Sequence, residues 1–321
     1  MKEFAAIALL AVAVVALPLF VSSGFVINLV IMMLYATLIG QAWNILAGFG
    51  GQFSFGHAVF FGTGAYAAAV LQVQFGWNAW LALPAAVALG AVVGAFIGAL
   101  SFRYGLRGSY FALVTLAFAE VFRILANTFQ FTGAGVGMMV PLGESAARFQ
   151  FATKTGFLYA ILAFTLAGFA VTLWLKHSRF GAWLQAVRDN EDSASALGVN
   201  VFRVKLGAIM ISGALMSAAG VFYVQYFRYI DPHIAYGPGI SIEALLAPIV
   251  GGIGTLFGPL LGAIVLGLLG EFTRNLVGDA PGVSLVAYGI VLVLMVTFLP
   301  RGIIGAFAGR VRPQRGKTTD A

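Results

Sequence analysis

The chain has 321 residues, of which 61% are hydrophobic and only 9% are charged, and its formal net charge is +7 at pH 7. A soluble domain carries roughly 25% charged residues, so no soluble fold of this size could bury so much apolar surface. The absence of cysteine excludes disulfides and thiolate chemistry. The three histidines have no metal-ligand spacing, so we expect neither a metal nor a cofactor. The composition predicts an all-α polytopic membrane protein.

Apolar segments recur along the whole chain, and a spanning helix needs about 20 residues. The expected spans are residues 4–21, 25–46, 55–73, 79–100, 109–128, 156–175, 206–227, 256–271 and 283–299. The first resembles the core of a signal peptide, but no clean A-x-A cleavage site follows it, so we interpret it as a span. We expect about 8–10 transmembrane helices in one domain, residues 1–305, and a basic cytoplasmic tail, residues 306–321.

Lys and Arg residues are concentrated in connections that alternate along the chain. They occur at Lys2, at Arg103 and Arg107, in the polar segment 176–205 and in the tail. The connections at 22–24 and 72–78 carry none. Because cytoplasmic loops are enriched in Lys and Arg, we expect both termini and the segment 176–205 to be cytoplasmic.

The strict alternation of spans fails near residue 240. A short apolar piece, residues 240–250, and the span 256–271 must together return the chain to the outer side. One arrangement is a re-entrant short helix, broken by a glycine turn within 251–254. The other is two full crossings, with the piece 240–250 extended at its start. Irregular backbone at this depth must be buried in protein or line a cavity.

Two glycine-rich turns precede apolar helices and weakly echo one another. They contain Gly50 and Gly51 in the first half, and Gly251, Gly252 and Gly254 in the second. Internal repeats with broken helices are common in transporters, although two such turns can also arise by chance. We interpret these five glycines as pore or gate candidates. Tight helix packing alone would also explain them.

A single acidic residue, Glu243, opens the short apolar piece. Its position near a helix start is favoured by the helix dipole, and it is a further candidate for the lining of a pathway. Glu120 and Arg123 stand three residues apart in the span 109–128, where they can neutralise one another.

The segment 176–205 is nearly the only long polar stretch of the chain. Its residues Phe180, Trp183, Leu184 and Val187 fall on one face of a helix. Asp189 or Asn190 can cap a second short helix, and Gly198 stands where that helix would end with a left-handed residue. Two short amphipathic helices suit docking in a groove of another protein. The alternative is a helix at the lipid interface.

Several runs of this sequence resemble one known family in the same order. The longest is SRFGAWLQAVRDNEDSASALGVNVFRVKLGAIMISGALMSAAGVFYV. The others are LRGSYFALVTLAFAE (106–120), IVGGIGTLFGPLLGAIVLG (249–267), YGIVLVLMVTFLPRGIIG (288–305) and the glycine-rich run at 44–71. Together they are similar to the LivM-type permeases of branched-chain amino-acid ABC importers over roughly residues 40–305.

The resemblance implies a permease subunit in a bacterial plasma (inner) membrane. It implies a second permease, identical or homologous, two cytoplasmic ATPase subunits and an extracytoplasmic substrate-binding protein, and no nucleic acid. By position, the ATPase contact would involve Arg188, Asp189, Asn190, Glu191 and Gly198. The implied cargo is a branched-chain or other small, mostly apolar amino acid, although related permeases carry urea, amides or aromatic acids.

The residues agree that any ATPase would be a separate chain, because the sequence contains no G-x-x-x-x-G-K-[ST] motif. A second hypothesis is an ion-coupled secondary transporter, for which Glu120 and Glu243 offer slender support. A third is an intramembrane enzyme. It would need convergent catalytic groups within the spans, and the histidines lie at loops or span ends instead.

Overall fold

The computed structural model describes residues 2–141, 143, 145–277, 286, 289, 290, 293 and 302–309. The helices of the first half are α1 (Lys2–Phe20), α2 (Gly24–Asn44), the π-helix η1 (Ile45–Phe49), α3 (Ala58–Val73), α4 (Ala79–Arg103) and α5 (Gly108–Thr128). Those of the second half are α6 (Lys154–His177), α7 (Arg179–Asp189), α8 (Glu191–Ala196), α9 (Val201–Phe227), α10 (Pro232–Tyr236), α11 (Pro238–Gly251), α12 (Gly258–Val277) and α14 (Gly302–Gly309). Short η2 (Gln130–Thr132), η3 (Ala146–Arg148), β1 (Met138–Met139) and β2 (Tyr229–Ile230) lie between them.

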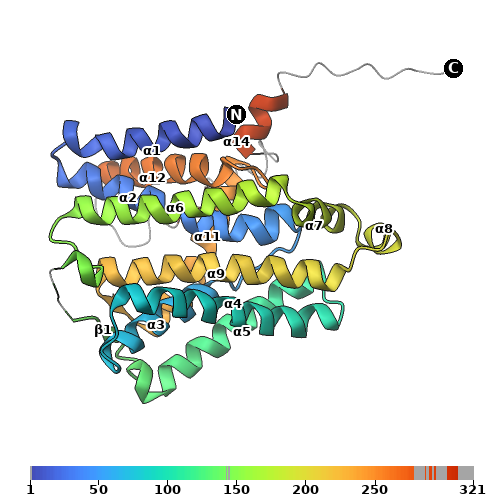
Figure 1. Cartoon of the computed structure of the whole chain (residues 1–321), viewed down its shortest axis with the longest axis horizontal. Coiled ribbons are helices and arrows are strands. Elements are labelled where there is room, and N and C mark those ends of the chain that lie inside the picture. Colours follow the sequence, from blue (N-terminus) through green and yellow to red (C-terminus); the bar gives the residue numbers. More distant parts are fainter. Residues whose placement is uncertain are drawn as a thin grey trace.

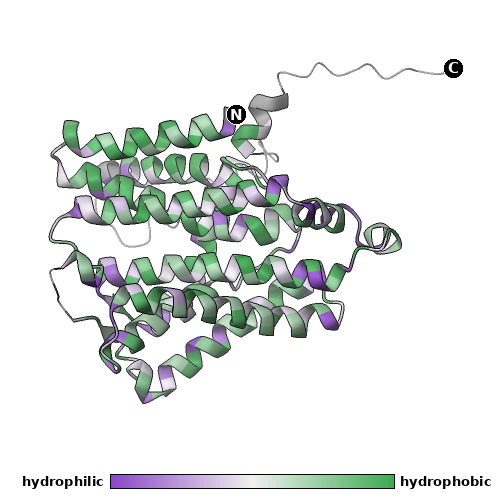
Figure 2. Cartoon of the chain, viewed as in Figure 1, coloured by the Kyte–Doolittle hydropathy of each residue, from purple (hydrophilic) through white to green (hydrophobic). Residues whose placement is uncertain are grey.

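The expected polytopic helical architecture is confirmed, and the long helices lie side by side in one bundle (Figure 1). Within the described ranges, six helices are long and apolar enough to cross a membrane, and α3 and α11 are shorter apolar helices. Apolar residues cover most of the bundle (Figure 2). The predicted span 283–299 lies almost wholly outside the described residues, as does the tail after Gly309.

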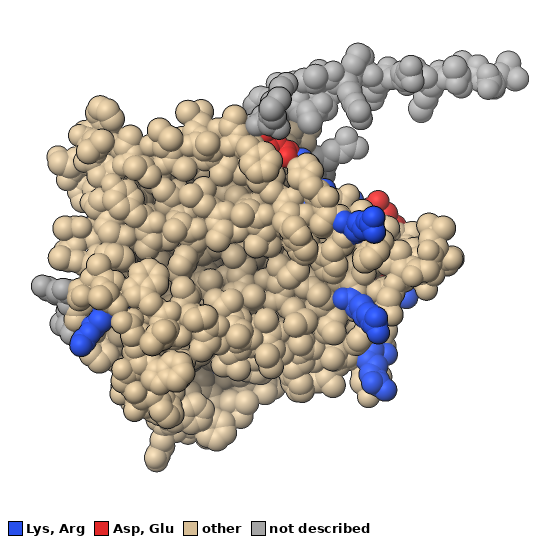
Figure 3. Space-filling model, viewed as in Figure 1, with Lys and Arg blue, Asp and Glu red and all other residues tan. Residues whose placement is uncertain are grey.

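One end of the bundle gathers the basic connections, and α7 and α8 project from it (Figures 1 and 3). Lys176, near the end of α6, forms an ion pair with Glu3 at the start of α1. Arg107, between α4 and α5, pairs with Glu191 of α8 at 2.9 Å. The start of the chain, the α4–α5 connection and α7–α8 therefore share one end, as the alternation of charge predicts.

The opposite end of the bundle is closed by a small antiparallel pairing of β1 with β2, in which Met138 faces Ile230. Helix α9 leads to it from the α8 end over 27 residues, about 40 Å at 1.5 Å per residue. It packs closely because its small residues meet other small residues. A Cβ atom on Gly90 of α4 would overlap Ser217 of α9. Such contacts let helix backbones approach closely.

Helix α3 begins deep inside the bundle, after an irregular segment. The Ser54 carbonyl accepts a 2.8 Å hydrogen bond from the Trp43 indole. The Phe55 amide donates to the Thr115 hydroxyl at 3.2 Å, and the Ala58 amide donates to the Ser241 hydroxyl at 3.0 Å. Side chains of other elements thus satisfy this backbone, which is the condition for irregular structure at membrane depth.

The two arrangements left open near residue 240 are now distinguished. The chain leaves α9 beside β1–β2 and continues through α10, Gly237 and α11, and the turn after α11 lies beside Gly48 and Arg188 at the α7 end. Helix α12 then leads back. This matches two crossings with the short piece extended at its start, rather than a re-entrant helix. The 14 residues of α11 span only about 21 Å, and α10 supplies the rest of the crossing.

Candidate functional site

Helix α7 is fastened to the bundle by one face. The Ser178 hydroxyl caps it by accepting a 3.1 Å hydrogen bond from the Gly181 amide. Leu184 and Val187 are fully buried, whereas Trp183 is 48% exposed. The predicted apolar stripe is therefore divided. Part of it attaches α7 to its own bundle, and the indole stays available on the surface.

Helix α8 starts and ends as the sequence indicates. Of the two capping candidates, Asn190 is the one used, because its side chain accepts a 2.8 Å hydrogen bond from the Ser193 amide. Gly198 has φ +87° and lies exposed just past the helix. The left-handed conformation expected there is confirmed, and glycine adopts it without a steric penalty.

Glu191 is turned inward rather than toward solvent. Its carboxylate accepts from the Arg107 guanidinium at 2.9 Å and forms an ion pair with Lys205 of α9. The Glu191 side chain is 14% exposed and that of Lys205 only 4%. The carboxylate thus ties α8 to α9 and to the α4–α5 connection, a role that sequence reasoning did not suggest.

Arg188, at the end of α7, reaches into the bundle. One of its guanidinium nitrogens donates to the Gly48 carbonyl at 3.1 Å. Two others donate to Asp189 at 3.0 Å each. Gly48 belongs to the buried π-helix η1, and short π-helices are frequent at functional sites. The exposed helix pair is therefore bonded directly to an irregular part of the bundle.

Asn44 joins the same π-helix to the second glycine-rich turn. Its side-chain oxygen accepts from the Gly254 amide at 2.8 Å, and its side-chain nitrogen donates to the Thr255 carbonyl at 3.0 Å. Gly48 is required here. A Cβ atom on it would overlap the Asn44 side chain and approach the Gly254 nitrogen to 2.6 Å.

The two glycine turns that the sequence singled out meet beneath α7. A Cβ atom on Gly50 would lie 3.1 Å from Leu184, and one on Gly51 would lie 2.7 Å from the Arg188 side chain. We call this set, consisting of Gly48, Gly50, Gly51, Gly254 and Arg188, the glycine junction. Asn44 and Gly48 were missed from sequence, where an Asn ending an apolar span was the available signal.

Gly251 and Gly252 lie at the edge of the junction. Gly251 ends α11 where a Cβ atom would overlap the Gly258 carbonyl of α12. Gly252 has φ +138° and a Cβ atom on it would lie 3.3 Å from Ile304 of α14. These two residues shape the α11–α12 turn and do not touch α7 directly.

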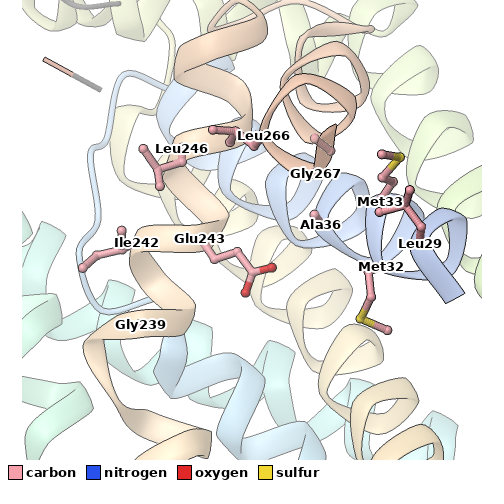
Figure 4. A pocket seen from close by; sticks show the side chains of 11 residues that line it. Leu29, Met32, Met33, Ala36, Gly239, Ile242, Glu243, Leu246, Leu266 and Gly267 are labelled. Atoms are coloured by element: carbon pink, nitrogen blue, oxygen red, sulfur yellow. The ribbon is translucent and has the colours of Figure 1, made fainter. Parts of the chain in front are cut away.

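Glu243 is not part of the junction. Its carboxylate points into a cavity of about 330 Å³ between α2, α11 and α12 (Figure 4). The lining residues are Leu29, Met32, Met33, Ala36, Gly239, Ile242, Glu243, Leu246, Ala263, Leu266 and Gly267. The cavity is apolar except for this carboxylate, which has no hydrogen bond or ion pair with any described residue.

Glu120 and His57, which the sequence also pointed to, each contact a neighbouring side chain. Glu120 accepts from Arg123 at 2.8 Å, forming the structural pair that their spacing allows. His57 is fully buried and contacts the Ser212 hydroxyl at 2.8 Å. Within the described part of the chain, no group of three or more acidic or histidine side chains could hold a metal ion.

The fold and the site define a class of multi-pass membrane protein. The exposed pair α7–α8 is bonded through Arg188 to η1, and Asn44 joins that broken element to the α11–α12 turn. Broken helices of this kind are common in transporters. The chain belongs to the family described as "Branched-chain amino acid transport system / permease component", which matches residues 4–296.

Relatives with related names support this membership. LivM of Salmonella typhimurium, a high-affinity branched-chain amino acid transport system permease protein, is 30% identical over 322 residues, covering 92% of this chain and 73% of its own. LivM of Escherichia coli K12 is 30% identical over 93% and 74% of the two chains. LivH of Escherichia coli K12 is 31% identical over 44% of each. None of the solved structures compared with the chain matches it.

Proposed function

We propose that this protein is the permease subunit of an ATP-driven importer for branched-chain or other small, mostly apolar amino acids. Its family and the names of its relatives support the cargo class. The observation that carries the mechanism is the hydrogen bond from Arg188 to the Gly48 carbonyl. Through this bond, an ATPase that moves α7 would also move the π-helix η1 inside the bundle.

In this proposal the ATPase subunits bind α7 and α8 on the cytoplasmic side. The exposed surface there includes Trp183, Asp189, Leu197 and Gly198. Among the expected contacts, Glu191 would act indirectly by holding α8 in place, because its carboxylate is already engaged. With α7–α8 inside, the start of the chain is cytoplasmic too, since Glu3 pairs with Lys176 at that end.

The remaining partners follow from the same orientation. A substrate-binding protein would deliver cargo at the β1–β2 end, and a second permease would complete the pore. Movement of α7 would shift the glycine junction, which connects the end of α2 to the α11–α12 turn through Asn44. These elements border the Glu243 cavity, so the same movement would change access to it.

An ion-coupled transporter working alone is the second candidate, and the unpaired Glu243 favours it. Purification from the native host in mild detergent distinguishes the two. We expect a stoichiometric ATPase to accompany the chain and leucine uptake by the reconstituted complex to require ATP. Uptake that persists without ATP but collapses with the proton gradient would reject the importer.

The Arg188 link itself is tested by Arg188→Ala. Loss of a hydrogen bond from a charged donor should cost about 1.5–3 kcal/mol. We expect leucine transported per ATP hydrolysed to fall by about tenfold or more, with the complex still assembled. The matched control is Arg179→Ala, an exposed residue at the start of the same helix, which should retain normal coupling. Equal coupling in both variants would count against the proposed path.

A further inference from the structure

The Glu243 cavity combines an apolar lining with a single carboxylate. Ten of its eleven lining residues are Leu, Ile, Met, Ala or Gly, and the eleventh is Glu243. Figure 4 shows the carboxylate directed away from α11 toward Met32 on α2. A carboxylate surrounded by apolar side chains needs a compensating positive charge, a proton or water.

Among the described residues, none supplies that charge. No Lys, Arg or His is among the described residues that line the cavity, and Glu243 has no ion pair with any of them. The helix dipole does not replace it. Helix α11 begins at Pro238, which places Glu243 in the second turn, and the dipole effect is confined to the first. The sequence-based explanation by the helix start is therefore insufficient.

A polar group without a partner lies nearby. The Tyr35 hydroxyl is buried and has no hydrogen-bond partner in the described structure. Tyr35 belongs to α2 and directly precedes Ala36, which lines the cavity. Tyr35 itself does not line the cavity, so the Glu243 carboxylate is the group that would accept hydrogen bonds from an N–H donor there.

We propose that Glu243 is the permease's own contact for the ammonium group of an amino acid. The aliphatic side chain would lie among Met32, Leu246 and Leu266. The volume of about 330 Å³ is at the lower end for small-molecule sites, which suits a cargo of this size. Because none of the described lining residues is a cation, the site would bind the ammonium group and the aliphatic side chain of the cargo, and would not bind its carboxylate. This inference rests on the proposed function and specifies its substrate contact.

The first test is chemical protection of the carboxylate in the purified importer complex without ATP. Dicyclohexylcarbodiimide reacts with carboxyl groups in apolar surroundings, and mass spectrometry of the Glu243 peptide measures the modified fraction. We expect L-leucine and 3-methylbutylamine, which carry the ammonium, to reduce modification severalfold. The deaminated analogue 4-methylpentanoate should not.

Glu271 on α12 is the internal control, because it lies 3.8 Å from the Arg274 guanidinium and does not line the cavity. Its modification should not respond to any of the three compounds. Modification of Glu243 that ignores leucine would overturn the proposal. So would equal protection by 4-methylpentanoate, since the site would then recognise only an apolar body.

The second test is leucine uptake by the reconstituted complex with Glu243→Gln and Glu243→Asp. The neutral amide should lower uptake by about tenfold or more, and aspartate should restore part of it. Elution profile and thermal midpoint establish that each variant is folded. Wild-type uptake without ATP dependence would reject the proposed function itself. ATP-driven uptake that Glu243→Gln leaves at the wild-type rate would reject only the ammonium site.

Discussion

The α7–α8 end and the cavity between α2, α11 and α12 each contain one glutamate directed toward the protein, and the two differ in their bonding. Glu191 is bonded to Arg107 and Lys205. Glu243 has neither an ion pair nor a hydrogen bond to the described residues. The first carboxylate has its partners within the protein, whereas the second has none among the described residues.

The difference shows that one chain can contain both a rigid ion-paired helix and a site with an unpaired carboxylate. A segment that transmits force must keep its shape, and the paired Glu191 holds α8 against α9 and the α4–α5 connection. A site that accepts and releases cargo must instead leave a group unsatisfied until the cargo arrives. The glycine junction lies between these regions and bonds one to the other.

The largest effect is expected from the connection itself. In Gly48→Ala, the new methyl group would overlap the Asn44 side chain and approach the Gly254 nitrogen. Overpacking of this kind lowers the free energy of unfolding by about 1–3 kcal/mol. It should also weaken the hydrogen bonds that join α7, η1 and the α11–α12 turn. We expect a lower thermal midpoint and little uptake. Gly24→Ala is the matched control, because nothing lies within 4 Å of its Cβ position. Similar midpoints for the two variants would disprove the close contact.

An intermediate effect is expected from the paired glutamate. Glu191→Gln removes the charge that faces Lys205, whose side chain is 4% exposed. Leaving that cation without its partner should lower the free energy of unfolding by about 1–3 kcal/mol. The thermal midpoint of the purified chain measures this. Asp192→Asn serves as the control, since its side chain is 88% exposed. A midpoint unchanged in Glu191→Gln would show that α8 is held by other contacts.

The smallest effect on stability is expected from the unpaired glutamate. Glu243→Gln removes a charge that has no partner to lose, so the free energy of unfolding should not fall by more than about 0.5 kcal/mol, and removal of an uncompensated charge acts to raise it. The same thermal measurement, made without amino acid, checks this. A destabilisation as large as that of Glu191→Gln would mean that the protein already satisfies Glu243, and the contrast between the two regions would disappear.

Much of the fold was accessible from the sequence, because length and hydropathy alone define a spanning helix. The expected span 79–100 corresponds to α4 (Ala79–Arg103), and 109–128 to α5 (Gly108–Thr128). Local chemistry also sufficed for α8, whose cap at Asn190 and left-handed Gly198 involve neighbouring residues only. These features depend on interactions within a few residues along the chain.

The site was accessible only in part, because its contacts join distant segments. Glycine content pointed to Gly51 and Gly254, but their meeting beneath Arg188 depends on how the helices pack. Glu191 belongs to a stretch that resembles an ATPase contact, yet its charge is taken by Lys205 and Arg107. Hydropathy does not reveal which charges will find one another in the folded bundle.

The two hydrogen bonds of Asn44 also constrain how the protein is made. Its partners Gly254 and Thr255 follow it by 210 and 211 positions, so they leave the ribosome long after α2 has entered the membrane. Until then the Asn44 amide has to be satisfied by water, lipid headgroups or the insertion machinery, because a bare amide in hydrocarbon is costly. During biosynthesis, Asn44 can therefore make these two hydrogen bonds only after the second half of the chain has been synthesised.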